Sequence, residues 1–389
     1  MRWRPAIAKT FFTIEPTYSG FTDQLTQFSA FYKLGLHLGY DYLHTTFISH
    51  RSNGSDIAPP VAGPDIHGFI GLNAHFQRRQ QTIAVGANVE PIVIGLSDDI
   101  VPAVATGSLT ELAGHVERSV GRASGPVLVK FQLDGERKRI FGLIQAAIPQ
   151  FQDGLDLPAL YADARIRAPI ATLHHGDGLK IVVHIRQGDT GVVQTPWGTF
   201  IPVWSHRGDQ LVEYDSFASI PSTQWQFEVG QYRQFLDELL GRLAPARSST
   251  LVFSDGADRG LKLIESNLEQ LAWSPDQTAS FREARAGYDQ RQFACFAGIE
   301  GIDLQVGETG LKLFQLVHSM LEADIVIVSN QQRMAPKLVA NLGRENSPKV
   351  IVLYKQAMPD NSDLICNHQD RFIYVDITNP DFDSLLRRL

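Results

Sequence analysis

The stretch IVVHIRQGDT, residues 181–190, combines an apolar run with a group of side chains that can do chemistry. Its β-branched residues are typical of a strand that is covered on both faces. His184, Arg186 and Asp189 follow at the end of this strand. A guanidinium forms paired hydrogen bonds with phosphate oxygens, so this strand end is a candidate for binding a phosphorylated ligand.

Two later strand-like segments end in a similar way. STLVFSD ends in Ser254 and Asp255, whereas DIVIVSN ends in Ser329 and Asn330, with Gln331 at the expected start of a helix. In open parallel sheets, ligands bind beyond the carboxyl ends of the strands. Backbone N–H groups at the start of the helix favour an anion, and the Asp255 carboxylate can accept hydrogen bonds from a ribose or a guanine edge. Together these groups predict a nucleotide diphosphate site with no obligatory metal.

Each of these residues also has a purely structural interpretation. Arg186 and Asp189 can form an ion pair that caps the strand, and His184 can be a hydrogen-bonded core imidazole. Ser329 and Asn330 are good N-cap residues whatever the function. Asp255 and the glycine after it form a turn by themselves. The sequence leaves these alternatives open.

The elements around these segments repeat an alternation of strand and helix patterns. The alternation runs once through residues 1–170, which we expect to form an N-terminal α/β domain, and restarts in residues 178–357, which we expect to form a Rossmann-like domain. Residues 160–178 are a candidate linker, and residues 358–389 can pack on either half. The predicted fold is α/β, with two Rossmann-like domains facing a cleft.

Length and charge limit the classes of function. A chain of 389 residues exceeds one ordinary core. The excess of 42 acidic over 35 basic residues, a net charge of −7, argues against non-specific nucleic-acid binding. Two cysteines are too few for a disulfide scaffold. We expect no transmembrane segment, since no apolar run of about 18 residues occurs, and a cytoplasmic protein, since the N-terminus makes a poor signal peptide.

The polar strand ends resemble motifs of the α1,2-, α1,6- and O-fucosyltransferase superfamily. HIRQGD is similar to its H-x-R-x-G-D motif, VFSDGAD to its second motif and HSMLEADIVIVSNQQ to its third. The segment YSGFTDQLTQFSAFYKLGLHLGY is similar to the glycine-rich motif that opens its acceptor-side domain. The four segments occur in the same order as in the superfamily.

The resemblance implies a GT-B fold and an inverting, metal-independent transfer of fucose. The donor substrate would be GDP-fucose, the acceptor a hydroxyl of a glycan or protein, and no cofactor is implied. Carried over by position, the implied site residues are Arg186 for the β-phosphate, His184 and Asp255 for the guanine or ribose, Ser329 with Asn330 or Gln331 for phosphate, Asp189 as the last motif residue, and Gly20, Asp23 and Gln24 across the cleft near the diphosphate and sugar.

The chain also departs from the superfamily pattern. Gln187 stands where several subfamilies have a second arginine, Asp23 where asparagine is usual, and Gln194 where the α1,6 group has an acidic residue. The donor sugar and the base that deprotonates the acceptor therefore stay open. The candidates for this base are Asp23, Glu213, Asp215 and Glu228, the last of which can instead serve a helix dipole.

Two further alternatives concern the aromatic segment and the class of function. Residues 191–226 carry many aromatic side chains, which either stack on acceptor sugars or form a packed flap. A GT-B transferase that uses another nucleotide sugar, or a non-catalytic nucleotide- or sugar-binding protein, would share the same pocket. A dehydrogenase is disfavoured, because no G-x-G-x-x-G follows a first strand.

Overall fold

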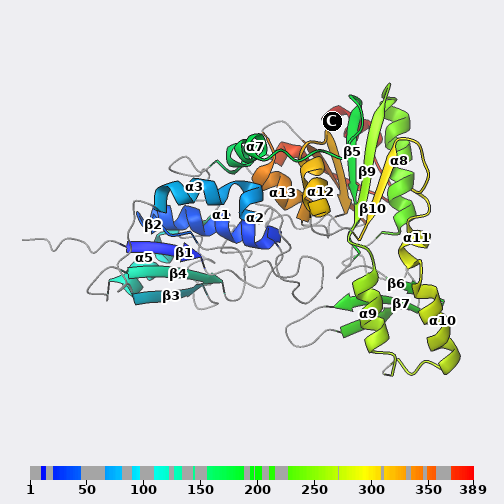
Figure 1. Cartoon of the computed structure of the whole chain (residues 1–389), viewed down its shortest axis with the longest axis horizontal. Coiled ribbons are helices and arrows are strands. Elements are labelled where there is room, and N and C mark those ends of the chain that lie inside the picture. Colours follow the sequence, from blue (N-terminus) through cyan, green and yellow to red (C-terminus); the bar gives the residue numbers. More distant parts are fainter. Residues whose placement is uncertain are drawn as a thin grey trace, which may run out of the picture.

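A computed structural model of the chain contains two parallel β-sheets and one small antiparallel sheet (Figure 1). Helices alternate with the strands in both parallel sheets, which confirms the α/β class. The structure describes residues 10–14, 21–44, 66–80, 90–96, 109–121, 127–133, 143–144, 156–187, 193–196, 198–203, 210–214, 227–269, 271–307, 311–329, 334–344, 348–355 and 369–389. Among them, no helix is long and apolar enough to cross a membrane.

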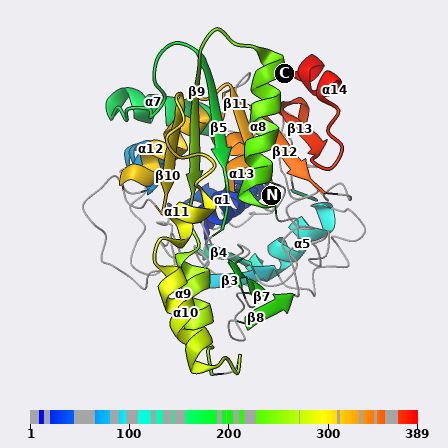
Figure 2. The same cartoon turned by 90° about the vertical axis from the view of Figure 1, so that its right-hand side faces the viewer.

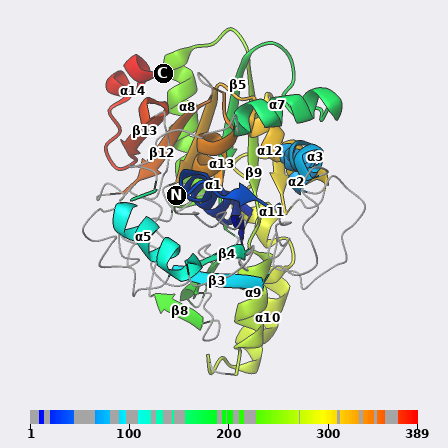
Figure 3. The same cartoon turned by 90° about the vertical axis from the view of Figure 1, so that its left-hand side faces the viewer.

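The first sheet has four parallel strands in the order β2-β1-β4-β3. Residues 11–14 of β1 are all buried, and Phe12 contacts the ring of Phe131 in β4 on one buried face. The helices of this half pack around the sheet (Figures 1 and 3). The elements are β1 (Thr10–Ile14), α1 (Phe21–His37), β2 (Asp41–Tyr42), α2 (Ile66–Ile70), α3 (Leu72–Gln80), β3 (Glu90–Leu96), α5 (Leu109–Val120) and β4 (Val127–Leu133).

Helix α1 forms the centre of this half. Its residues 25–35 are all buried, because one side packs on the first sheet and the other on a helix of the second half. Phe31 stacks on Phe131 of β4, with 5.6 Å between the ring centroids. Gly35 is required by close packing, since a Cβ there would lie 2.4 Å from the ring of Phe12.

The second sheet has six parallel strands in the order β10-β9-β5-β11-β12-β13. Counted along the chain from β5, this order is 3-2-1-4-5-6, the doubly wound arrangement of dinucleotide-binding domains. Its strands are β5 (Leu179–His184), β9 (Ser248–Ser254), β10 (Ile302–Val306), β11 (Ile325–Ser329), β12 (Lys349–Tyr354) and β13 (Phe372–Asp376).

Helices cover both faces of the second sheet. Ile181 and Val183 of β5 belong to a core with α8 (Val229–Leu243) and α14 (Phe382–Arg388), whereas Val182 belongs to a core with α12 (Leu311–Leu321) and α13 (Met334–Leu342). Burial on both faces explains the unbroken apolar runs of the central strands. The segment from residue 369, which opens with a short 3-10 helix, packs on this half and supplies β13 and α14.

The expected linker 160–178 is wrong in its first part, because α7 (Leu157–Arg167) is a helix. Asp156 caps it by accepting the N–H of Ala159 at 3.0 Å. No clean apolar stripe marks this helix, since its buried face carries Tyr161 and Arg165 beside aliphatic residues. Polar residues on a buried face conceal the helical period that identifies such a segment.

The two halves are in direct contact through these helices. Helices α1 and α13 lie side by side (Figures 1 and 3), and Ser29 Oγ donates to Asn341 Oδ1 at 3.0 Å between them. Helix α7 lies between the two sheets in the chain and contacts elements on both sides: Arg165 donates to the carbonyl of Phe69 in α2 at 3.0 Å. The Tyr161 hydroxyl hydrogen-bonds His318 Nδ1 at 2.7 Å. Apolar residues of both sheets therefore belong to one continuous core. The domain limits stay a prediction.

A separate lobe lies beyond the carboxyl ends of the second sheet (Figure 2). It combines the insertion after β5 with the insertion after β9, and both pack around the buried side chains of Phe200, Leu261 and Phe281. This third core is distinct from those of the sheets. The elements of the lobe are β6 (Val193–Thr195), β7 (Gly198–Val203), β8 (Gln210–Tyr214), α9 (Asp258–Ser266), α10 (Pro275–Arg285) and α11 (Tyr288–Gln292).

Candidate functional site

The sheet topology brings the three polar strand ends together. Strand β5 lies between β9 and β11, with His184 in register with Phe253 on one side and Val328 on the other. The strand order reverses between β5 and β11, which makes this the topological switch point of the sheet. Doubly wound sheets bind their ligands in the crevice at this point. The candidate site is therefore the carboxyl edge of β9, β5 and β11 (Figure 2).

His184 is a buried, neutral imidazole at the end of β5. Its ring stacks on that of Phe253, with centroids 4.4 Å apart. Burial first, and the positive charge of Arg186 second, lower the pKa of His184 to about 3. Among the described residues, Nδ1 has no hydrogen-bond partner although it is buried. His184 is thus a core imidazole, as its structural interpretation predicts. That interpretation also predicts a hydrogen bond, which Nδ1 does not form with any described residue.

Arg186 and Asp255 lie on neighbouring strand ends. The Arg186 side chain is partly exposed and Asp255 is exposed at the start of the β9–α9 turn. The backbone N–H of Gln187 donates to Asp255 Oδ1 at 2.7 Å. One carboxylate oxygen of Asp255 therefore fixes the backbone just after β5. Asp255 thus has the structural role in the turn that the sequence left open as an alternative.

Ser329 ends β11 as a buried residue. Only 4% of it is exposed, and its side chain hydrogen-bonds that of Tyr232 on α8. Burial raises the pKa of Tyr232, so this phenol stays protonated. The Ser329 hydroxyl is therefore engaged inside the fold.

Several predicted site residues are not described. Gly20, Asp189, Asn330 and Gln331 lie outside the described residues, as does Asp215. Asp23 and Gln24 lie in the first turn of α1, but the structure does not describe their side chains.

The other candidates for the acceptor base lie at the surface. Glu213 is exposed on β8. Glu228 is exposed as the N-cap of α8, where Gln231 Oε1 accepts its backbone N–H at 3.0 Å. This capping arrangement supports the helix-terminus alternative for Glu228.

The aromatic insertion is at least partly a packed flap. Phe200 is fully buried and lies edge-on to Trp273, with 5.7 Å between the ring centroids. Trp273 in turn contacts Phe281 of α10. Trp197, Trp204, Phe217 and Trp225 lie outside the described residues, so an acceptor role for them stays a prediction.

Asp289 is a residue of this site that sequence reasoning missed. It lies in α11, and its Oδ1 accepts the backbone N–H of Ala257 at 2.9 Å. Ala257 is the N-cap of α9, so a carboxylate already occupies the N-terminus of this helix. A second anion is disfavoured there. No local sequence signal reveals this contact, because its partners are 32 residues apart.

Within the described part of the chain, no group of three or more His, Cys, Asp or Glu side chains is arranged as metal ligands would be. Cys295 is a half-buried free thiol. Burial raises the pKa of Cys295, which keeps the thiol protonated.

The second sheet and its polar edge define a doubly wound α/β domain with a candidate nucleotide site. Family models and curated proteins give no match to the chain. A solved structure of a mutant of FUT1 from Arabidopsis thaliana in complex with GDP is 12% identical, with a TM-score of 0.37, over 93% of this chain and 73% of that one. The ADP-heptose LPS heptosyltransferase II of Escherichia coli is 11% identical, with a TM-score of 0.33, over 94% and 90%. At these TM-scores the likeness alone defines neither family nor function.

Proposed function

We propose that the chain is a GT-B glycosyltransferase that binds a nucleotide sugar at the carboxyl edge of the second sheet. The observation that carries the proposal is the position of Arg186, at the switch point between β5 and β11 of a doubly wound sheet. We infer GDP-fucose as the donor from the motif resemblance of HIRQGD and VFSDGAD. The acceptor is a hydroxyl of a glycan or protein.

The charges of the edge divide the site into two sides. The Arg186 guanidinium favours the diphosphate on the β5–β11 side. On the other side, the Asp289 carboxylate occupies the N-terminus of α9, and Asp255 offers an exposed carboxylate. Such a side disfavours phosphate and suits the donors of a ribose diol or a guanine base.

The reaction would be an in-line displacement at the anomeric carbon. The acceptor oxygen forms a bond to this carbon while the bond to the β-phosphate oxygen breaks, through an oxocarbenium-like transition state. Arg186 stabilises the charge that develops on the leaving diphosphate. Asp23, in the first turn of α1, is our candidate to accept the proton of the acceptor hydroxyl.

The test combines ligand binding with turnover. Thermal-shift measurements with GDP, UDP, dTDP and ADP should show stabilisation by GDP, and GDP-fucose should be consumed in the presence of hydroxyl acceptors. Arg186→Ala should weaken both signals, whereas Arg167→Ala, which removes an exposed arginine of α7, should not. Stabilisation by UDP or dTDP alone would show that the donor is a different nucleotide sugar from GDP-fucose. Binding of GDP without turnover on any acceptor would favour the non-catalytic alternative.

A further inference from the structure

The turn between β9 and α9 carries Asp255. It is held locally by Ser254 Oγ, which accepts the N–H of Gly256 at 3.1 Å, and also by a side chain from elsewhere in the chain. Ala257 is the N-cap of α9 and has no side chain that could cap the helix. Ser, Thr, Asp or Asn at this position normally accept one of the free N–H groups of the first turn. Here the carboxylate of Asp289, which comes from α11, accepts the N–H of Ala257 at 2.9 Å.

The packing around this carboxylate is close. Gly256 has a φ of +72°, which only glycine adopts readily. A Cβ on Gly256 would lie 2.6 Å from Asp289 Oδ2, so the second oxygen fills the space beside the turn. Burial and the nearby charge of Asp258 raise the pKa of Asp289, while the hydrogen bond from Ala257 acts against them.

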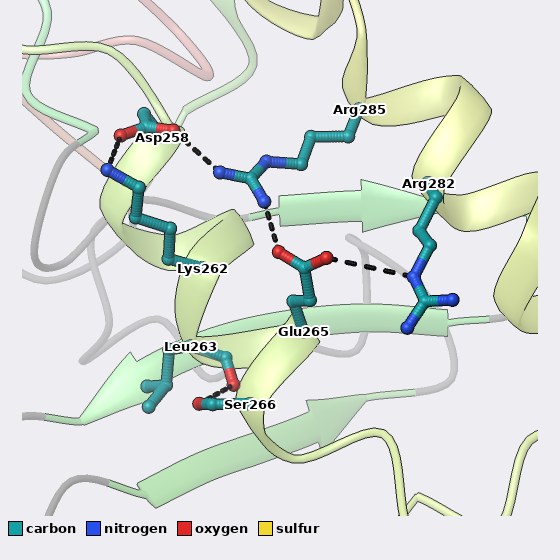
Figure 4. Close-up of polar contacts among 7 residues, drawn as sticks. All are labelled: Asp258, Lys262, Leu263, Glu265, Ser266, Arg282 and Arg285. Carbon is teal, nitrogen blue, oxygen red and sulfur yellow. Dashed lines mark hydrogen bonds and ion pairs between the residues drawn. The ribbon is translucent and has the colours of Figure 1, made fainter.

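The neighbouring acidic residue has a different task. Asp258 lies in the first turn of α9 and forms ion pairs with Lys262 at 2.7 Å and with Arg285 of α10 at 3.0 Å (Figure 4). These pairs join α9 to α10 inside the lobe. Asp289 instead acts on the backbone of the turn, at the point where the lobe joins the sheet.

We propose that Asp289 is a positioning residue of the nucleotide site. By holding the N–H of Ala257, it fixes the turn that presents Asp255 to the ligand and to the Gln187 backbone. The contact with a ligand rests on the proposed function, whereas the support of the turn does not.

The experiment measures the stability of the turn and the affinity for the ligand separately. Hydrogen exchange over residues 255–262 is followed in the free protein by mass spectrometry, and the affinity for GDP is measured by calorimetry. The variants are Asp289→Ala and Asp289→Asn, which keeps an oxygen acceptor. The matched control is Asp156→Ala, which removes a similar cap from α7, where Asp156 accepts an N–H at 3.0 Å.

In Asp289→Ala we expect exchange in the turn to rise on the order of tenfold, the effect of a lost helix cap. The affinity for GDP should fall severalfold in the same variant. Asp289→Asn should restore both properties toward the wild type, and Asp156→Ala should change neither. Unchanged exchange in Asp289→Ala, or faster exchange with unchanged GDP affinity, overturns the proposal. If the wild-type chain binds no GDP, the proposed function fails, and the exchange result alone supports or overturns the role of Asp289.

Discussion

Gln187 and Asp255 join the ends of two neighbouring strands, because the Gln187 N–H donates to Asp255 Oδ1 at 2.7 Å. Gln187 follows Arg186 directly, so this hydrogen bond also fixes the backbone next to Arg186 relative to the Asp255 carboxylate. This hydrogen bond joins the ends of β5 and β9, whereas the proposed diphosphate site lies on the other side of β5, beside β11. Because β5 and β9 are neighbouring strands, a ligand that contacts Arg186 also lies close to the turn that carries Asp255.

The first prediction concerns the two substitutions of Arg186. Arg186→Ala should weaken GDP binding by about tenfold to a hundredfold, the usual value of a hydrogen bond to a charged group. Arg186→Lys should recover part of the loss, because lysine keeps the charge but not the planar fork. Calorimetric titration with GDP measures both. Equal affinities in the wild type and Arg186→Ala would remove the phosphate role.

The second prediction concerns the buried pair Tyr232 and Ser329. Tyr232→Phe should lower the free energy of unfolding by about 1–3 kcal/mol, because it leaves the Ser329 hydroxyl without this partner. Combining it with Ser329→Ala should cost less than the sum of the two single changes. Urea denaturation of the four proteins measures this coupling. Strict additivity would mean that the hydrogen bond contributes nothing.

The third prediction concerns pH and His184. Its folded pKa of about 3 lies below the ordinary value of 6.5, so its contribution to stability is complete above 6.5 and is lost as the pH falls toward 3. Protonating one site in the unfolded state costs about 1.4 kcal/mol of stability per pH unit.

The variant His184→Phe keeps a ring against Phe253 but cannot titrate. Across the same pH window, its free energy of unfolding should fall less steeply than that of the wild type. His174 and His318, whose pKa values are also lowered by burial, are present in both proteins and cancel in the comparison. Parallel pH profiles would show that His184 takes up its proton in the folded state.

The fourth prediction compares two glycines with similar backbones. Gly256 and Gly298 have φ values of +72° and +69°, but only Gly256 faces a close neighbour, Asp289 Oδ2. Both Gly→Ala substitutions should cost about 1–2 kcal/mol for the left-handed conformation. Gly256→Ala should cost more and should also weaken GDP binding. Thermal denaturation of the two variants checks this, and equal losses would contradict it.

The fifth prediction concerns the ion-pair network of the lobe (Figure 4). Arg285 pairs with both Asp258 and Glu265 and is its least exposed cation. Arg285→Ala should lower stability by about 1 kcal/mol, and Lys262→Ala, which removes a more exposed partner, by less. Both losses should shrink at high salt. A larger effect for Lys262→Ala would reverse this ranking.

The central strands of the second sheet were predictable from the sequence. Strands β5, β11 and β12 are buried on both faces. Such strands have unbroken apolar runs, which can be recognised directly in the sequence. Strand β10 was missed, because this edge strand is only half-buried and alternates apolar with polar residues over five positions. Short alternating runs do not stand out from loops.

The residues that support the site were harder to predict. Tyr232 of α8 contacts the end of β11 and Asp289 of α11 contacts the turn after β9, and nothing near them in the sequence marks these contacts. Such contacts depend on how helices pack on the sheet, which the local pattern of residues does not encode. The motif positions His184 and Arg186 could be named from residue types alone, but their burial could not.

The most direct measurement is a crystal structure of the protein with GDP. The proposal predicts the diphosphate at the switch point between β5 and β11, within hydrogen-bonding distance of the Arg186 guanidinium, and the nucleoside on the Asp255 side. A diphosphate bound beside Asp289 at the N-terminus of α9, or a nucleotide bound away from the carboxyl edge of the sheet, would contradict it.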